Sequence, residues 1–233
     1  MDEKIAIQQI VNDSIRKKNN KKETREQNCW HVSGIGSCMR GQYLQRLGNK
    51  PDQEIDDRTL RVFDIGNKLE DWMVNLLKES KELEEGIIKI ETQVKVQSSE
   101  LDLRGRADLV IEKQDLKRVY EIKSKHSKAF WYMDKKGQGA QREHEYQIWT
   151  YMYLLGIEQG SIVYISKDDL AILEYPVLLN NEQLKKEVLN YLEQLNYCWE
   201  NKIMPPLIDA KSWQARYCRY HQQCLNYEKV GIK

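Results

Sequence analysis

A carboxylate and a lysine stand two positions apart at Glu121 and Lys123, in a segment predicted to be a β-strand. Because side chains alternate between the two faces of a strand, both point to one face and Ile122 points to the other. A carboxylate beside a lysine suits a divalent metal ion and the water molecule that such an ion activates. The spacing alone is weak, since it also occurs at Glu79 and Asp115, so the surrounding sequence must decide.

A second acidic residue, Asp108, lies one predicted hairpin earlier, at the start of the apolar run 109–111. A carboxylate there is costly to bury without a partner, and a metal ion or a lysine would remove that cost. Gly105 allows a bulge or a close approach of another chain segment. Asp108 and Glu121 can lie on neighbouring strands, where both reach one hard cation such as Mg²⁺ or Mn²⁺.

The elements that must position these residues follow from hydrophobic spacing and turn residues. Helices are predicted at residues 3–18, 39–47, 57–82, 141–156 and 181–201. Strands are predicted at residues 88–96, 103–112, 118–124, 161–166 and 171–178. The first three strands form an antiparallel meander. The inner side of the 57–82 helix is predicted to carry Phe63, Leu69, Trp72, Met73, Leu76 and Leu77.

This order of elements predicts one α/β domain with a mixed sheet. Its core spans residues 56–202, between an N-terminal helical segment, 1–55, and a C-terminal cysteine-containing lobe, 203–233. The chain has 233 residues, of which 40% are hydrophobic and 31% charged, with five cysteines. Without a run of about 18 apolar residues or a secretory signal, we expect a cytoplasmic protein with no membrane partner. Its cysteines are expected to be reduced thiols or metal ligands rather than a disulfide framework.

The net charge of +1 hides a local excess of positive charge. Residues 117–142 contain eight basic and two acidic side chains, a stripe that can follow a polyanion or form a solvated face. Within it, Trp131 and Tyr132 stand among lysines. They can stack on unpaired bases or pack in the core.

Four segments, in this order, resemble the PD-(D/E)XK nuclease superfamily and its RecB-like exonucleases: residues 63–70, 105–108, 121–123 and 147–151. The resemblance implies a restriction-endonuclease-like core and metal-dependent cleavage of DNA. It implies that Mg²⁺ or Mn²⁺ is held by Glu70, Asp108, Glu121 and the backbone carbonyl of Ile122, and that Lys123 orients the water molecule or stabilises the transition state. Glu70 stands where the RecB-like branch usually has histidine, and a carboxylate favours Mg²⁺.

Gln147 and Tyr151 lie four residues apart and so share a helix face. The resemblance implies that they orient the active site or touch the DNA backbone. Lys125 and Lys128 are expected to contact DNA as well. The neighbouring aromatic residues of this helix are equally consistent with packing in the core.

Cys38, Cys218 and Cys224 resemble part of the four-cysteine iron–sulfur arrangement of CRISPR-associated RecB-like exonucleases, with Ala215 in place of one cysteine. A cluster would then need a substitute ligand such as His221, Cys29 or solvent. Zinc bound by the three cysteines and His221 is a second possibility. A lost site with buried thiols is the third.

The sequence therefore predicts a metal-dependent DNA exonuclease that acts on DNA ends, with a preference for single strands. It resembles the CRISPR adaptation exonuclease that processes prespacer ends, which implies CRISPR integrase subunits as partners. A phage or plasmid recombination exonuclease of the same fold remains an alternative. So does a catalytically silent module that binds DNA ends.

Overall fold

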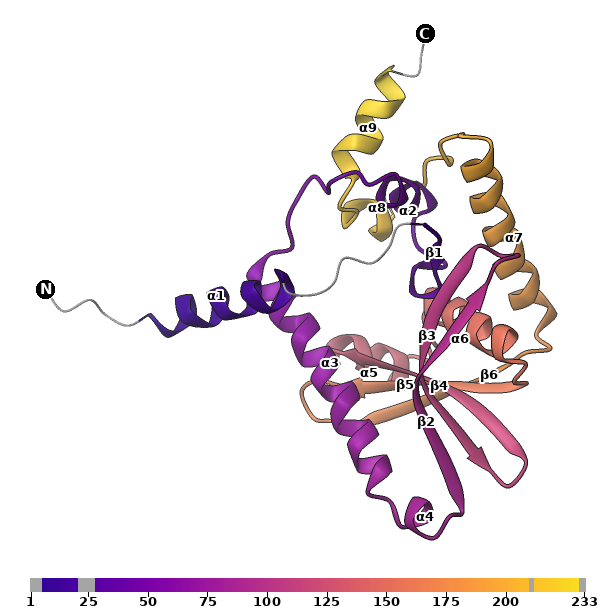
Figure 1. The fold of residues 1–233 in the computed structure, drawn as a ribbon. Coiled ribbons are helices and arrows are strands. Elements are labelled where there is room, and N and C mark those ends of the chain that lie inside the picture. The colour runs from indigo at the N-terminus through magenta and orange to yellow at the C-terminus, as the bar shows by residue number, and fades with distance from the viewer. Residues whose placement is uncertain (1–5, 21–27, 210–211, 231–233) are drawn as a thin grey trace, which may run out of the picture.

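The protein folds around one mixed sheet with helices on both faces (Figure 1). The structure, a computed structural model, describes residues 6–20, 28–209 and 212–230. Its helices in those ranges are α1 (Ile7–Asn20), α2 (Met39–Arg46), α3 (Asp57–Lys78), α4 (Lys81–Glu84), α5 (Ser127–Lys135), α6 (Arg142–Leu155), α7 (Glu182–Glu200), α8 (Trp213–Arg216) and α9 (His221–Val230), with a 3-10 turn at Val32–Gly34. Its strands are β1 (Trp30–His31), β2 (Ile88–Ser98), β3 (Leu103–Lys113), β4 (Leu116–Lys125), β5 (Gln159–Ser166) and β6 (Ile172–Leu178).

The sheet has the order β1-β3-β4-β5-β6, and β2 also pairs with β3. β2, β3 and β4 form the predicted antiparallel meander. β5 then lies parallel to β4, which requires the crossover that α5 and α6 provide, and β6 returns antiparallel to β5. The predicted α/β class with a mixed sheet is confirmed.

β3 and β4 separate in the middle of the sheet and leave a gap between them, which we call the fork. Polar side chains can gather in this gap. Their pairing runs only as far as Leu109 and Tyr120. Beyond that point β3 continues beside β2 and β1, whereas β4 continues beside β5. Asp108 and Glu121 are the first residues past the last pair. Asp108 and Glu121, which were predicted to act together, therefore lie where the two strands separate.

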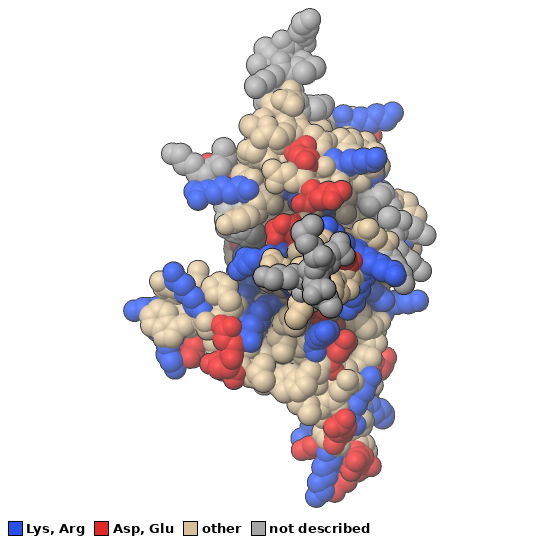
Figure 2. All heavy atoms as spheres, turned by 90° about the vertical axis from the view of Figure 1, so that its left-hand side faces the viewer, with Lys and Arg blue, Asp and Glu red and all other residues tan. Residues whose placement is uncertain are grey.

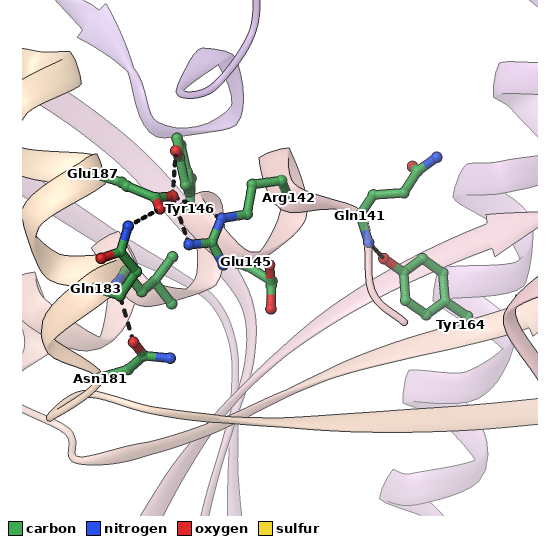
Figure 3. Close-up of polar contacts among 9 residues, drawn as sticks. Gln141, Arg142, Glu145, Tyr146, Tyr164, Asn181, Gln183 and Glu187 are labelled. Carbon is green, nitrogen blue, oxygen red and sulfur yellow. Dashed lines mark hydrogen bonds and ion pairs between the residues drawn. The ribbon is translucent and has the colours of Figure 1, made fainter. Parts of the chain in front are cut away.

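α6 is held against the sheet and against α7, so its position beside the fork is fixed. At the sheet, a Cβ atom on Gly160 would lie 2.6 Å from Met152 Sδ, which shows how closely α6 approaches β5. At α7, Glu187 accepts hydrogen bonds from Arg142 Nη2 at 2.5 Å and from the Tyr146 hydroxyl at 2.8 Å (Figure 3). These contacts join α6 to the strand that follows it in the chain, β5, and to the later helix α7.

Two expectations for the segment 57–82 were wrong. The helix breaks in two, because the Ser80 side chain accepts a hydrogen bond from the backbone N–H of Leu83 and so caps the start of α4. Phe63, Trp72 and Leu76 are exposed rather than on an inner side. α3 lies close to the sheet at Gly66, where an added Cβ would lie 3.2 Å from Ser124 Oγ, whereas those three side chains remain uncovered.

Beyond the sheet, α2 lies beside α8 and α9 (Figure 1). Leu44 of α2 packs with Tyr220 and Cys224 in a small apolar cluster of their own. Arg46 is sandwiched between the rings of Trp30 and Trp199, at 4.3 and 4.1 Å from their centroids. The division at residues 55 and 202 stays a prediction. Among the described residues, no helix is long and apolar enough to cross a membrane.

Candidate active site

A cavity of about 930 Å³ opens at the fork between β3 and β4. Side chains from α3, β2, β3, β4 and α6 line it, and they include most residues that the sequence singled out. The predicted site residues that line it are Glu70, Asp108, Glu121, Ile122, Lys123, Gln147 and Tyr151. Residues separated by up to 81 positions in the chain thus share one cavity.

Glu121 is the most deeply buried acidic group of the cavity, with 1% of its surface exposed. Its Oε1 atom accepts hydrogen bonds from Gln147 Nε2 at 2.7 Å and lies 2.5 Å from Lys123 Nζ. Its Oε2 atom is buried and has no hydrogen-bond partner among the described residues. A buried carboxylate oxygen without a partner is costly, and a bound cation would supply the missing interaction.

Asp108 is fixed by the backbone of the neighbouring strand. Its Oδ2 atom accepts a hydrogen bond from the N–H of Ile122 at 2.9 Å, across the point where the fork opens. This bond places the Asp108 carboxylate beside Glu121 and Lys123. The carbonyl role of Ile122 that the resemblance implied stays a prediction.

The acidic groups of the cavity resist ionisation in the absence of a cation. Burial raises the pKa of Glu70 to about 7, and repulsion from Asp108 adds to this effect. Burial likewise raises the pKa of Glu121 to about 8 and raises the pKa of Asp108. Burial opposes the charge of Lys123, but the nearby carboxylates outweigh it and raise the lysine pKa. Lys123 and Arg106 act to lower the pKa values of Glu70 and Asp108, but burial outweighs both positive charges.

This donor set fits a hard divalent cation, because carboxylate oxygens are the ligands that Mg²⁺ and Mn²⁺ prefer. The unpartnered Oε2 atom of Glu121 marks where a cation would contribute most. In the conformation described, no group of three or more His, Cys, Asp or Glu side chains is arranged to hold a metal ion. The same cavity is lined by Glu70, Asp108 and Glu121, but in this conformation their side chains are not close enough together to coordinate one ion.

Gln93 also belongs to this site, although no pattern in the sequence predicts it. Its Nε2 atom donates a hydrogen bond to Glu70 Oε1 at 2.9 Å. The pairing of β2 with β3 skips Gln93, which lies opposite Asp108, and its backbone has the positive φ of 53° that residues other than glycine rarely adopt. A backbone distortion of this kind is invisible in the pattern of a strand.

Gln147 and Tyr151 lie on one face of α6, as their spacing predicts, and the Gln147 Nε2 atom is 3.5 Å from the Tyr151 hydroxyl. Gly105 makes room for that tyrosine. A Cβ atom on Gly105 would lie 2.9 Å from Tyr151 Cε1 and 2.8 Å from Val32 Cγ2, so the close approach expected at this glycine is confirmed.

Lys125 and Lys128 lie outside the cavity. Lys125 donates a hydrogen bond to Gln141 Oε1, and its Nζ atom lies 5.7 Å from the centroid of the Tyr164 ring. Lys128 is exposed on α5, a helix that the sequence analysis did not predict. Contact of either lysine with DNA stays a prediction.

The three cysteines of the proposed iron–sulfur arrangement come together where α2 meets the C-terminal segment. The Cys218 thiol is hydrogen-bonded to both Cys38 and Cys224. Ala215, in the position of the fourth cysteine, is buried. In the described part of the chain these thiols do not form a group that holds a metal ion, so three thiols alone do not complete a cluster.

Comparison with known proteins agrees with this geometry. Residues 42–225 match the PD-(D/E)XK nuclease superfamily, and the chain belongs to that superfamily. The match includes every residue proposed for the cavity. A search of curated proteins finds no match.

Solved structures share the fold at low sequence identity. SSO0001 has a TM-score of 0.58 at 20% identity, over 94% of this chain and 96% of that one. The alkaline exonuclease LHK-Exo from Laribacter hongkongensis has a TM-score of 0.52 at 18% identity, over 76% and 92%. A phage related exonuclease from Haemophilus somnus 129PT has a TM-score of 0.50 at 14% identity, over 79% and 97%.

Proposed function

We propose that this protein is a metal-dependent exonuclease that acts on DNA ends, with a preference for single strands, and that the chain works as one nuclease domain. One observation carries the proposal: Asp108, Glu121 and Lys123 meet at the fork of the sheet, around a buried carboxylate oxygen that has no partner among the described residues. A buried carboxylate oxygen without a partner calls for an explanation, and a bound cation supplies one.

The similar structures support the choice of substrate and reaction. Two of them are exonucleases by their titles, and LHK-Exo has also been solved in complex with dAMP. The charge distribution suits a polyanion. Lys and Arg side chains gather across the middle of the face that carries α1 and α3 (Figure 2). Positive charge on this surface attracts the phosphates of DNA.

Glu70, Asp108 and Glu121, with the backbone carbonyl of Ile122, would hold Mg²⁺ or Mn²⁺. When bound, such an ion lowers the pKa of a water molecule and neutralises charge on the phosphate. Lys123 orients the attacking water molecule and stabilises the negative charge that grows on the phosphate oxygens. Glu121 keeps the Lys123 ammonium in place at 2.5 Å, and Gln147 keeps Glu121 in place at 2.7 Å.

The test is cleavage of end-labelled single-stranded and duplex DNA by purified protein with Mg²⁺, with Mn²⁺ or with EDTA. We expect metal-dependent shortening from an end, and its loss in Asp108→Asn. If folded protein binds DNA equally well with chelator but leaves it intact under each metal, the chain is a silent DNA-end-binding module and the proposal is wrong.

We further propose a role like that of the CRISPR adaptation exonucleases, with integrase subunits as partners. This finer assignment is supported by the contact of Cys218 with Cys38 and Cys224, because the resemblance places a cluster there. Cys38 and Cys218 are 180 residues apart in sequence, so the fold itself brings them together. Iron analysis of anaerobically purified protein tests the cluster. A [4Fe–4S] cluster predicts about four iron atoms per chain, and iron-free folded protein would contradict it.

A recombination exonuclease of a phage or plasmid is the second candidate. The similarity to a phage related exonuclease favours it. The two roles share the site chemistry and differ in their protein partners. Co-purification with CRISPR integrase subunits would favour the first role, and co-purification with a strand-annealing protein would favour the second.

A further inference from the structure

We propose that the exposed face of α5 binds the unpaired bases of a single-stranded substrate by stacking them on Trp131. This inference rests on the proposed function, because it concerns the path of the same DNA strand. The helix combines two exposed aromatic rings with several lysines, immediately after the strand that carries Glu121 and Lys123.

The aromatic side chains of this face are not part of the core. Trp131 is 46% exposed and Tyr132 is 42% exposed. Their rings meet edge to face, with centroids 5.2 Å apart. The other side of α5 does the packing, since Phe130 and Met133 are buried in the main apolar core. The helix would keep its core contacts if the two exposed rings were removed.

The charges around the rings match a nucleic acid. Lys128, Lys135 and Lys136 are exposed, and Lys136 Nζ lies 5.3 Å from the centroid of the Trp131 ring. α5 itself carries one acidic residue, Asp134, which pairs with Lys135 at 2.8 Å. Single-strand binding surfaces combine the same two features, namely cations that follow the phosphates and flat rings on which bases stack. A purely apolar protein partner would not need the lysines.

The position of α5 allows one strand to reach both the cavity and the rings. Seven residues separate Lys123 from Trp131 along the chain, namely two of β4, His126 and four of α5. Four extended steps of about 3.3 Å and four helical steps of about 1.5 Å place the two Cα atoms at most about 19 Å apart. About six nucleotides at the rise of a duplex strand span that distance. Lys125 stands on the same face of β4 as Lys123, on the way to α5.

α5 is also a firm platform, which reduces the entropy that binding would cost. Its first N–H group, on Ser127, donates to Asp168 Oδ2 at 2.8 Å. The Met133 carbonyl near its other end accepts from the Tyr175 hydroxyl at 3.1 Å. Both partners belong to the β5–β6 hairpin region, so the helix is tied to the sheet at both ends.

The experiment measures binding of a labelled oligothymidylate of about 16 nucleotides, near the upper end of single-strand sites, by fluorescence anisotropy in EDTA. It compares the unmodified protein with Trp131→Ala, Trp131→Phe and Tyr197→Ala. Tyr197 is the matched control, because it is 58% exposed on α7. We expect Trp131→Ala to weaken binding by about fivefold or more, Trp131→Phe to recover most of it, and Tyr197→Ala to leave it unchanged.

A second oligomer of the same length and charge but without bases separates stacking from electrostatics. On that oligomer, Trp131→Ala and the unmodified protein should bind equally. Unchanged binding of oligothymidylate by Trp131→Ala, or an equal loss on both oligomers, would overturn the inference. Because EDTA prevents metal-dependent cleavage, failure of the nuclease proposal would appear only in the separate cleavage assay.

Discussion

Gln147 Nε2 lies 2.7 Å from Glu121 Oε1, and this hydrogen bond ties α6 directly to the buried carboxylate of β4. Glu121 therefore has one oxygen held by Gln147 and Lys123, and a second oxygen free to meet a cation. α6 is in turn fixed to α7 through Glu187, whose pKa falls to about 2 because Gln183, Tyr146 and Arg142 donate hydrogen bonds to it (Figure 3). The orientation of Glu121 thus depends on a helix that is anchored well away from the cavity.

Replacement of Gln147 by methionine should slow cleavage without unfolding the protein. The substitution keeps the size of the side chain but removes the donor to Glu121. A buried hydrogen bond to a charged group contributes about 1.5 to 3 kcal/mol, which corresponds to a rate loss of about tenfold or more. Single-turnover cleavage at saturating Mg²⁺ measures the loss. Gln194→Met, on the exposed face of α7, is the control, and equal rates for the two variants would refute the role of Gln147.

Gln93 should affect the site and the stability in separable ways. Gln93→Ala and Gln93→Gly both remove the hydrogen bond to Glu70, so both should lower the cleavage rate to a similar extent. Only glycine relieves the positive φ of 53°. We therefore expect Gln93→Gly to be about 1 kcal/mol more stable than Gln93→Ala in urea unfolding. Equal stabilities would contradict the strain, and unchanged rates would contradict the positioning role.

The rate of cleavage should rise with pH when Mg²⁺ is scarce. Glu70 and Glu121, with pKa values raised to about 7 and about 8, hold protons that a metal ion must displace. Between about pH 6 and pH 9 the cleavage rate should therefore increase. A higher Mg²⁺ concentration should move the midpoint of this curve of rate against pH to lower pH. A midpoint that does not depend on Mg²⁺ would show that these carboxylates do not bind the ion.

The same groups predict how stability varies with pH in the absence of a metal ion. Between about pH 4.5 and pH 8 the folded protein holds protons on Glu121 and Glu70 that the unfolded chain has released. The free energy of unfolding should therefore fall as the pH rises through that range, and added Mg²⁺ should restore it. Thermal unfolding in EDTA measures this slope. Glu121→Gln should show a shallower slope, and an equally steep one would contradict the assignment of the raised pKa.

The sequence was most informative where one periodicity dominates. Alternation placed Glu121 and Lys123 on one face of β4, and helical spacing placed Gln147 and Tyr151 together on α6. Gly105 also marked a true close approach. The two shared faces depend on local geometry, which neighbouring residues in the chain decide, whereas the approach at Gly105 is a tertiary contact with Val32 and Tyr151.

The remaining features depend on tertiary contacts that no local pattern encodes. The apolar residues of α3 predicted an inner side, yet Phe63 and Trp72 are exposed, so their spacing did not identify the face of the helix that the sheet covers. The helix α5 was not predicted, because its residues were interpreted as part of a stripe of positive charge. Gln93 could not be found at all, since its place in the site follows from an irregular backbone opposite Asp108.

The most direct test of the central claim compares Glu121→Gln with Glu145→Gln in cleavage of end-labelled DNA with Mg²⁺. The two substitutions are chemically identical. Glu121 is buried in the cavity, whereas Glu145 pairs with Arg142 on the outer part of α6. We predict that Glu121→Gln loses cleavage by several factors of ten, and that Glu145→Gln retains it. Full metal-dependent cleavage by folded Glu121→Gln would contradict the account.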